Sequence, residues 1–138
     1  MLDEIILIDD DKIVTAINKR IISKLLPEAS IKTFENGEEG LKYLITAQDS
    51  NLRTLIFLDL NMPIMDGFQF LSIYENAMAY QEHSFVICLL TGSIAEEDQQ
   101  KAAKFPSVLE YAQKPLSEKV IHGLIERAAE KLNKKILP

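Results

Sequence analysis

Acidic residues follow two of the most apolar stretches of the chain, and carboxylates in this arrangement suit metal and phosphate chemistry. Asp9 and Asp10 come directly after the apolar run 5–8, and Asp59 comes directly after the apolar run 55–58. Apolar runs without alternation are typical of strands buried on both faces of a parallel sheet. Because ligands in open α/β sheets bind at the carboxyl ends of strands, we expect the three carboxylates to share one site.

Three carboxylates in one cleft cannot all stay ionised without a compensating cation. Mg²⁺ prefers oxygen ligands, and it is usually held by one or two carboxylates together with waters and phosphate oxygens. Lys114 and Thr91 each follow another expected strand, where they can offer an ammonium group and a hydroxyl to the same cleft. A carboxylate nucleophile, a metal, a lysine and a hydroxyl suit the acceptance of a phosphoryl group, because that reaction needs positioning and charge neutralisation.

The elements that must position these residues alternate between strand and helix patterns. The sequence predicts strands at 5–8, 30–34, 55–58, 85–90 and 108–112. It predicts helices from residue 13 to before Pro27, from Asn36 to near Gln48, over about 66–78 and about 94–104, and after Ser117. This alternation favours an α/β fold with a parallel sheet, helices on both faces and right-handed crossovers. The three most apolar strands, at 5–8, 55–58 and 85–90, are expected at its centre.

Local patterns add detail to the helices. On the first helix, helical spacing predicts an apolar face at Ile13, Ile17, Ile21 and Leu25, with Val14 and Ile22 beside them. Capping boxes are predicted at the starts of three helices, in the pairs Asn36 with Glu39, Asp66 with Gln69, and Ser93 with Glu96. The helix at about 94–104 has few large apolar residues, so it should be the least firmly packed.

Composition limits the classes of protein to consider. With 138 residues, 47% of them hydrophobic, the chain is expected to form one domain over 1–138 without an output domain. A net charge of -6 opposes direct binding of nucleic acid, which depends on clustered Lys and Arg. The apolar runs are too short for a membrane span and no signal segment is present, so a cytoplasmic location is expected. The single cysteine, Cys88, lies in an apolar run and is expected to be a buried, reduced thiol.

The order of these motifs resembles the receiver domain of response regulators, and is similar to the single-domain chemotaxis type, over about residues 3–133. The residues that carry the resemblance are the acidic pair Asp9-Asp10, the stretch 58–63 around Asp59, the turn Asp66-Gly67, Thr91 and the pair Lys114-Pro115. The resemblance implies a doubly wound, flavodoxin-like sheet of five parallel strands in the order 2-1-3-4-5 with five helices.

The resemblance also implies a role for each site residue. Asp59 would be the phosphoacceptor, and Asp10, Asp9 and the backbone carbonyl of Asn61 would join it in holding Mg²⁺. Lys114 would assist the chemistry, and Thr91 and Tyr111 would be the switch residues. Two features depart from the family pattern: Gly92 follows the switch hydroxyl, and residues 105–107 replace a Gly-Ala pair, so the loop there is expected to differ in shape.

The implied function is a phosphorylatable signalling switch rather than an enzyme, although it assists its own phosphorylation and dephosphorylation. Its partners would be a sensor histidine kinase or histidine phosphotransfer protein, and an effector or a second copy of the chain bound at the face of the fourth helix, fifth strand and fifth helix. The alternatives are a pseudo-receiver that only binds a partner and a hydrolase with an aspartyl-phosphate intermediate. A pseudo-receiver should lack part of the site, and a hydrolase of that kind has an acid where Asn61 stands. A flavodoxin-like electron carrier is opposed by the acids after the first strand, which would repel a phosphate.

Overall fold

The computed structural model of the chain describes residues 1–47, 51–78, 85–92 and 95–136, with side chains to residue 133. Five strands form one sheet: β1 (Glu4–Ile8), β2 (Ser30–Phe34), β3 (Thr54–Asp59), β4 (Phe85–Thr91) and β5 (Val108–Gln113). The strands are all parallel, in the order β2-β1-β3-β4-β5. Five helices alternate with them: α1 (Lys12–Leu25), α2 (Gly37–Thr46), α3 (Gly67–Ala77), α4 (Glu96–Ala102) and α5 (Glu118–Ile136). The predicted doubly wound α/β fold is therefore confirmed.

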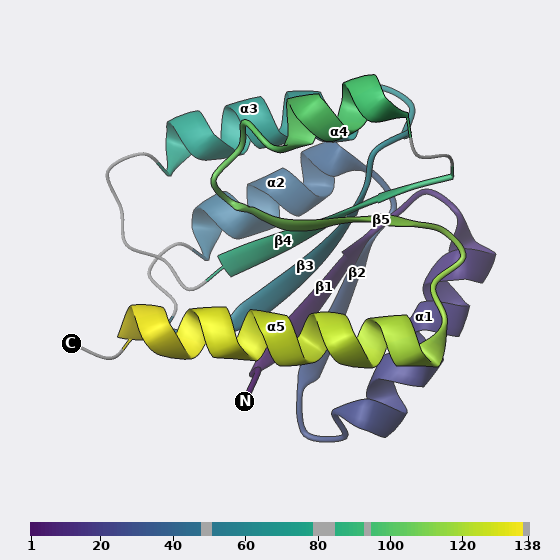
Figure 1. The fold of residues 1–138 in the computed structure, drawn as a ribbon, viewed down its shortest axis with the longest axis vertical. Coiled ribbons are helices and arrows are strands. Elements are labelled where there is room, and N and C mark those ends of the chain that lie inside the picture. Colours follow the sequence, from purple (N-terminus) through teal and green to yellow (C-terminus); the bar gives the residue numbers. More distant parts are fainter. Residues whose placement is uncertain (48–50, 79–84, 93–94, 137–138) are drawn as a thin grey trace.

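Helices cover both faces of the sheet. Figure 1 shows α2, α3 and α4 on one face and α1 and α5 on the other. Each face has its own apolar core: Ile6, Ile8, Ile56 and Leu58 point toward α2 and α3, while Ile5, Leu7, Leu55 and Phe57 point toward α1 and α5. The period-two alternation of strand side chains produces this division. No helix within the described residues is both long and apolar enough to cross a membrane.

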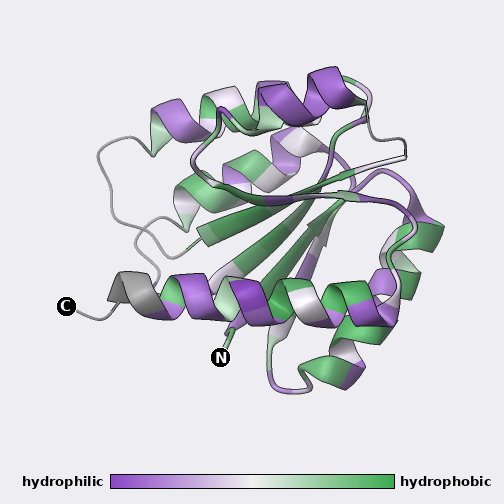
Figure 2. Ribbon diagram, viewed as in Figure 1, coloured by the Kyte–Doolittle hydropathy of each residue, from purple (hydrophilic) through white to green (hydrophobic). Residues whose placement is uncertain are grey.

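The predicted central strands are confirmed. Every residue of β1, β3 and β4 is buried, and Figure 2 shows these strands as almost wholly hydrophobic. The edge strands β2 and β5 are mostly half-buried or exposed. Burial on both faces explains why the central strands have no alternation in sequence. The strands extend slightly further than predicted, so that Asp59 and Thr91 are the last residues of β3 and β4.

The predicted apolar face of α1 is wrong in its first half. Ile13 is 73% exposed and Ile17 is 53% exposed. The buried residues of this helix are Ile22, which is predicted beside the apolar face, and Asn18, which is not predicted to be buried. Two apolar stripes at helical spacing overlap on this helix, and only packing against the sheet decides between them.

Helix ends agree with the sequence in most cases. Asp66 and Gln69 form the predicted capping box of α3, and Asn36 accepts from the backbone N–H of Glu39 at 2.8 Å at the start of α2. The hydroxyl of Ser117 accepts from the backbone N–H of Val120 at 3.1 Å, as an N-cap of α5 does. Helix α2 ends at Thr46, and Gln48, its predicted end, lies outside the described residues.

Helix α4 is shorter than the predicted range of about 94–104. The helix has Ala95 as its N-cap, without a side-chain hydrogen bond; Ser93 and Ile94 lie outside the described residues. Three acidic residues in its first turn interact favourably with the positive end of the helix dipole, and they stabilise this start in the absence of a hydroxyl cap. The helix ends at Ala102, because the residue before Pro106 is disfavoured in helical conformation.

A buried acid lies at the amino end of the sheet, away from the strand ends where the predicted site residues stand. Glu4 is 2% exposed. Its carboxylate accepts hydrogen bonds from the hydroxyls of Tyr43, at 2.5 Å, and Thr54, at 3.0 Å. Two hydroxyl donors satisfy this carboxylate inside the protein.

The close packing of α2 on β1 leads to a testable prediction. A Cβ added at Gly40 would meet Cδ1 of Ile8, a fully buried side chain, at 2.6 Å. Gly40→Ala gains about 1 kcal/mol of helix propensity, but overpacking costs roughly 1–3 kcal/mol. We expect a net loss of stability of about 1 kcal/mol in urea denaturation. Gly92→Ala is the control, because a Cβ there meets nothing within 4 Å; equal or higher stability of Gly40→Ala would contradict the packing.

Candidate phosphoacceptor site

Three carboxylates meet at the carboxyl edge of the sheet. Strands β1 and β3 are neighbours with Ile8 opposite Leu58, so the acids that end or follow these strands lie side by side. Ligand oxygens of Asp9, Asp10 and Asp59 all lie within 4.8 Å of one another. Asp9 and Asp59 are buried, and Asp10 is exposed. The cluster is therefore open to solvent on the side of Asp10.

Lys114 joins two of these acids. Its Nζ lies 3.3 Å from Oδ2 of Asp9 and 3.3 Å from Oδ1 of Asp59. The backbone holds the lysine in place, because its N–H donates to the carbonyl of Thr91 at 2.6 Å, directly beyond the end of β5. One ammonium group is thus shared by two buried carboxylates.

Backbone N–H groups donate to the aspartates at the ends of β1 and β3 in the same local geometry. The N–H of Asp11 donates to Oδ1 of Asp9 at 2.9 Å, and the N–H of Asn61 donates to Oδ1 of Asp59 at 3.3 Å. In each case an aspartate accepts from the residue two positions later, as in an Asx turn. The sequence analysis did not predict these donors, although an aspartate at a strand end before a turn is a signal for them. The Asp11 side chain accepts from Ile13 and Val14 and caps α1.

The charges at the site are poorly balanced. Burial and, to a smaller extent, the neighbouring Asp9 raise the pKa of Asp59, Lys114 and the N–H of Asn61 oppose the shift, and the net pKa is about 6. Burial alone would lower the pKa of Lys114, but Asp59 and Asp9 together outweigh it, so that the pKa is raised. At neutral pH Asp59 is largely ionised and Lys114 is charged. The pair of buried acids therefore holds more negative charge than Lys114 compensates.

The residues fit a hard divalent cation. All three acids offer oxygen atoms at short mutual distance, and oxygen ligands suit Mg²⁺ rather than the nitrogen and sulfur ligands typical of zinc sites. The exposed side of the cluster leaves room for waters or phosphate oxygens. The backbone carbonyl of Asn61 stays a predicted ligand.

The predicted switch residues lie on the two strands beside the acids. Thr91 is the last residue of β4 and is buried. Tyr111 lies on β5 opposite Leu89 of β4, and its ring packs against the core beneath α2 and α3. Its hydroxyl oxygen is buried and has no hydrogen-bond partner among the described residues. The hydroxyl oxygen of Tyr111 is therefore shielded from solvent in this conformation, while the residue as a whole is half-buried.

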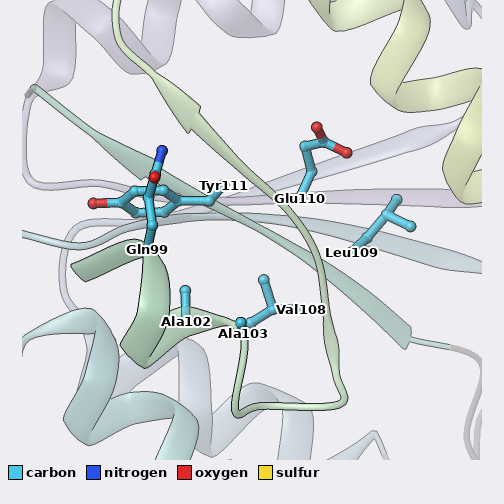
Figure 3. A pocket seen from close by; sticks show the side chains of 7 residues that line it. All are labelled: Gln99, Ala102, Ala103, Val108, Leu109, Glu110 and Tyr111. Atoms are coloured by element: carbon cyan, nitrogen blue, oxygen red, sulfur yellow. The ribbon is translucent and has the colours of Figure 1, made fainter. Parts of the chain in front are cut away.

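A groove separates α4 from β5. It has a volume of about 330 Å³ and is lined from the helix by Gln99, Ala102 and Ala103 and from the strand by residues 108–111. Figure 3 shows the small side chains of Ala102 and Ala103 facing Val108, with Tyr111 and Gln99 at the other end. Ala102 is the only buried residue of α4. The predicted weak packing of this helix is consistent with the groove.

Comparison with known proteins identifies the family. The profile of the response regulator receiver domain matches residues 5–126. The chain belongs to the response regulator receiver family. A comparison with curated proteins found no match.

Solved receiver structures share the fold of this receiver domain over nearly its whole length. A two-component response regulator from Cytophaga hutchinsonii is 26% identical, with a TM-score of 0.80, and the match covers 94% of this chain and 98% of that one. A receiver domain protein from Clostridium thermocellum is 20% identical, with a TM-score of 0.77 and coverage of 99% and 100%. The chemotaxis protein CheY4 of Vibrio cholerae is 19% identical, with a TM-score of 0.72 and coverage of 93% and 99%.

The raised pKa of Asp59 predicts how stability depends on pH. A carboxyl that binds its proton more tightly when folded loses stability as the pH rises from its unfolded value, near 4, through about 6. Asp59→Asn removes that charge, so without divalent cations the variant should be more stable than the parent at pH 7, by roughly 1–2 kcal/mol. Below about pH 4 the gain should vanish, because Asp59 is then neutral in both states.

Urea denaturation in EDTA between pH 4 and pH 8 measures this difference. Asp66→Asn is the matched control, since Asp66 is exposed and lies outside the acid cluster. A variant Asp59→Asn that is less stable than the parent at pH 7, by the same amount at every pH, would contradict the assigned charge balance.

Proposed function

We propose that this receiver domain accepts a phosphoryl group on Asp59 in a Mg²⁺-dependent reaction and thereby changes its affinity for a partner protein. The observation that carries the proposal is the shared position of Lys114 between the carboxylates of Asp9 and Asp59, beside the exposed Asp10. Membership of the receiver family supports the same chemistry.

In the proposed reaction a carboxylate oxygen of Asp59 attacks the phosphorus atom of the donor. A phosphorus–oxygen bond forms to Asp59, and the bond between phosphorus and the leaving group breaks, so that its electron pair stays with the imidazole of a phosphohistidine or with the acetate of acetyl phosphate. With a pKa of about 6, Asp59 is mostly ionised at pH 7 and can act as the nucleophile. Asp59 is consumed once per event, so the chain is a phosphoacceptor rather than an enzyme acting on other molecules.

The neighbouring residues supply positive charge and hydrogen bonds. Mg²⁺ held by Asp9, Asp10, Asp59 and the carbonyl of Asn61 would neutralise charge on the phosphoryl oxygens. Lys114 is within 3.3 Å of Asp59, so its ammonium group can pair with a phosphoryl oxygen once the carboxylate is esterified. The hydroxyl of Thr91, at the end of the adjacent strand, is the proposed donor to another phosphoryl oxygen.

Output is proposed to occur at the face formed by α4, β5 and α5. Helix α4 has a single buried residue and no side-chain cap, so little packing opposes its displacement. The groove beside Tyr111 offers space for rearrangement. A histidine kinase or phosphotransfer protein would supply the phosphoryl group, and an effector protein or a second copy of the chain would bind the changed face.

Incubation with acetyl phosphate and Mg²⁺ tests the proposal. Intact mass spectrometry should show one added phosphoryl group on the parent chain and none on Asp59→Asn, because the amide is not a nucleophile for phosphorus. Omission of Mg²⁺, or its chelation with EDTA, should also abolish the modification.

Two results would count against the proposed role. A modified Asp59→Asn protein would move the acceptor to Asp9 or Asp10. Repeated turnover of a phosphomonoester would favour a hydrolase. Asp66→Asn serves as the control for substitution as such, and it should be phosphorylated like the parent.

A further inference from the structure

The carboxyl end of α4 and the segment that follows it contact α3 in two places. The ring of Phe105, just after α4, stacks on the ring of Phe68 in α3 with centroids 6.3 Å apart and an interplanar angle of 20°. Nζ of Lys101, in the last turn of α4, lies 4.8 Å from the centroid of the same Phe68 ring. The face and surroundings of Phe68 are therefore occupied by groups from α4 and the segment that follows it.

The second contact lies further along α3. One carboxylate oxygen of Glu75 accepts from the backbone N–H of Ser107 at 3.0 Å and from its hydroxyl at 2.6 Å. Hydrogen bonds to an ionised acceptor are stronger than those between neutral groups. We call these five residues, Phe68, Glu75, Lys101, Phe105 and Ser107, the α3–α4 clasp.

The clasp stands beside the groove between α4 and β5. Lys101 directly precedes Ala102 of the groove, and the connection 104–107 joins Ala103, the groove residue that directly follows α4, to Val108, the first groove residue of β5. Since α4 has only Ala102 buried and no side-chain cap at its start, its own packing on the sheet is small. The contacts of the clasp add a second attachment at its carboxyl end.

The clasp also begins beside the phosphoacceptor. Phe68 follows Gly67, whose N–H donates to the carbonyl of Leu60 at 2.8 Å. A Cβ at Gly67 would meet Cα of Leu60 at 2.9 Å and the carbonyl oxygen of Asp59 at 3.2 Å. The first turn of α3 thus packs closely against the backbone of Asp59 and Leu60, with Cδ1 of Leu89 also 3.1 Å from the position of that Cβ.

We infer that the α3–α4 clasp holds α4 over β5 and transmits a change at Asp59 to the groove through α3, by a route that includes neither Thr91 nor Tyr111. The inference rests on the proposed function, because it needs a ligand-dependent change at Asp59. Displacement of the loop after β3 would move the first turn of α3 and the Phe68 ring with it. Phe105 and Lys101 would then carry the end of α4 along, which changes the width of the groove.

The test compares Phe68→Leu, Phe105→Leu and the double variant with the parent, using NMR-detected amide exchange with and without beryllofluoride and Mg²⁺. Without the ligand, each single variant should exchange the amides of α4 roughly fivefold faster, because a stacked pair that restrains the helix is lost. The double variant should exchange no faster than Phe68→Leu, since that substitution already removes the contacts of the Phe68 ring with both Phe105 and Lys101. With the ligand, the change at residues 96–103 should be at least about twofold smaller in the variants than in the parent.

Phe34→Leu is the matched control. Phe34 is also a half-buried aromatic residue on the same core, and its ring makes a tilted contact with Tyr43, with an interplanar angle of 37°, instead of contacting α4. This variant should keep the exchange rates and the ligand response of α4. Two further variants, Ser107→Ala and Lys101→Gln, leave the core unchanged and serve if the phenylalanine variants fail to fold. Each should also reduce the response of α4 to beryllofluoride.

The possible failures are distinguishable. If all the clasp variants bind beryllofluoride and show the full response in α4, the clasp does not transmit the change and the inference is wrong. If the parent itself neither binds beryllofluoride nor accepts a phosphoryl group from acetyl phosphate, the proposed function is wrong, and the inference falls with it.

Discussion

The site depends on one constraint: the buried carboxylate of Asp59 has too few hydrogen-bond donors among the described residues to compensate for its burial. At the opposite end of the sheet, two hydroxyls donate to the buried Glu4. Asp59 is equally buried, but it accepts one backbone hydrogen bond at 3.3 Å and shares the Lys114 ammonium with Asp9. The cluster thus has three carboxyl groups and a single ammonium group, an excess of acids that a divalent cation would balance.

The fold keeps these carboxylates close together despite the energetic cost, because the surrounding strands fix their positions. The registers of β1 with β3 and of β3 with β4 place the strand ends in one row. The backbone bond from Lys114 to Thr91 brings the lysine to the same row. The apolar cores on both faces of the sheet supply the stability that offsets the buried charge. On this account the binding free energy of a cation and a phosphoryl group is available to shift the conformation.

Sequence patterns predicted the elements and the strand ends well, because the central strands are uniformly apolar and Asp59 interrupts that pattern abruptly. They failed where two patterns competed. On α1 the stripe through Ile13 and Ile17 is solvent-exposed, since contact with the sheet selected the stripe through Asn18 and Ile22. Long-range contacts were also beyond reach: no local signal pairs Phe68 with Phe105, 37 positions later (105 − 68 = 37).

A crystal structure of the chain with Mg²⁺ and beryllofluoride tests the central claim most directly. The account predicts beryllium bonded to a carboxylate oxygen of Asp59, Mg²⁺ ligated by the acid cluster, and the ammonium group of Lys114 paired with a fluoride. Beryllofluoride attached to Asp9 or Asp10, or an acid cluster without Mg²⁺ at saturating concentrations of both ligands, would contradict it.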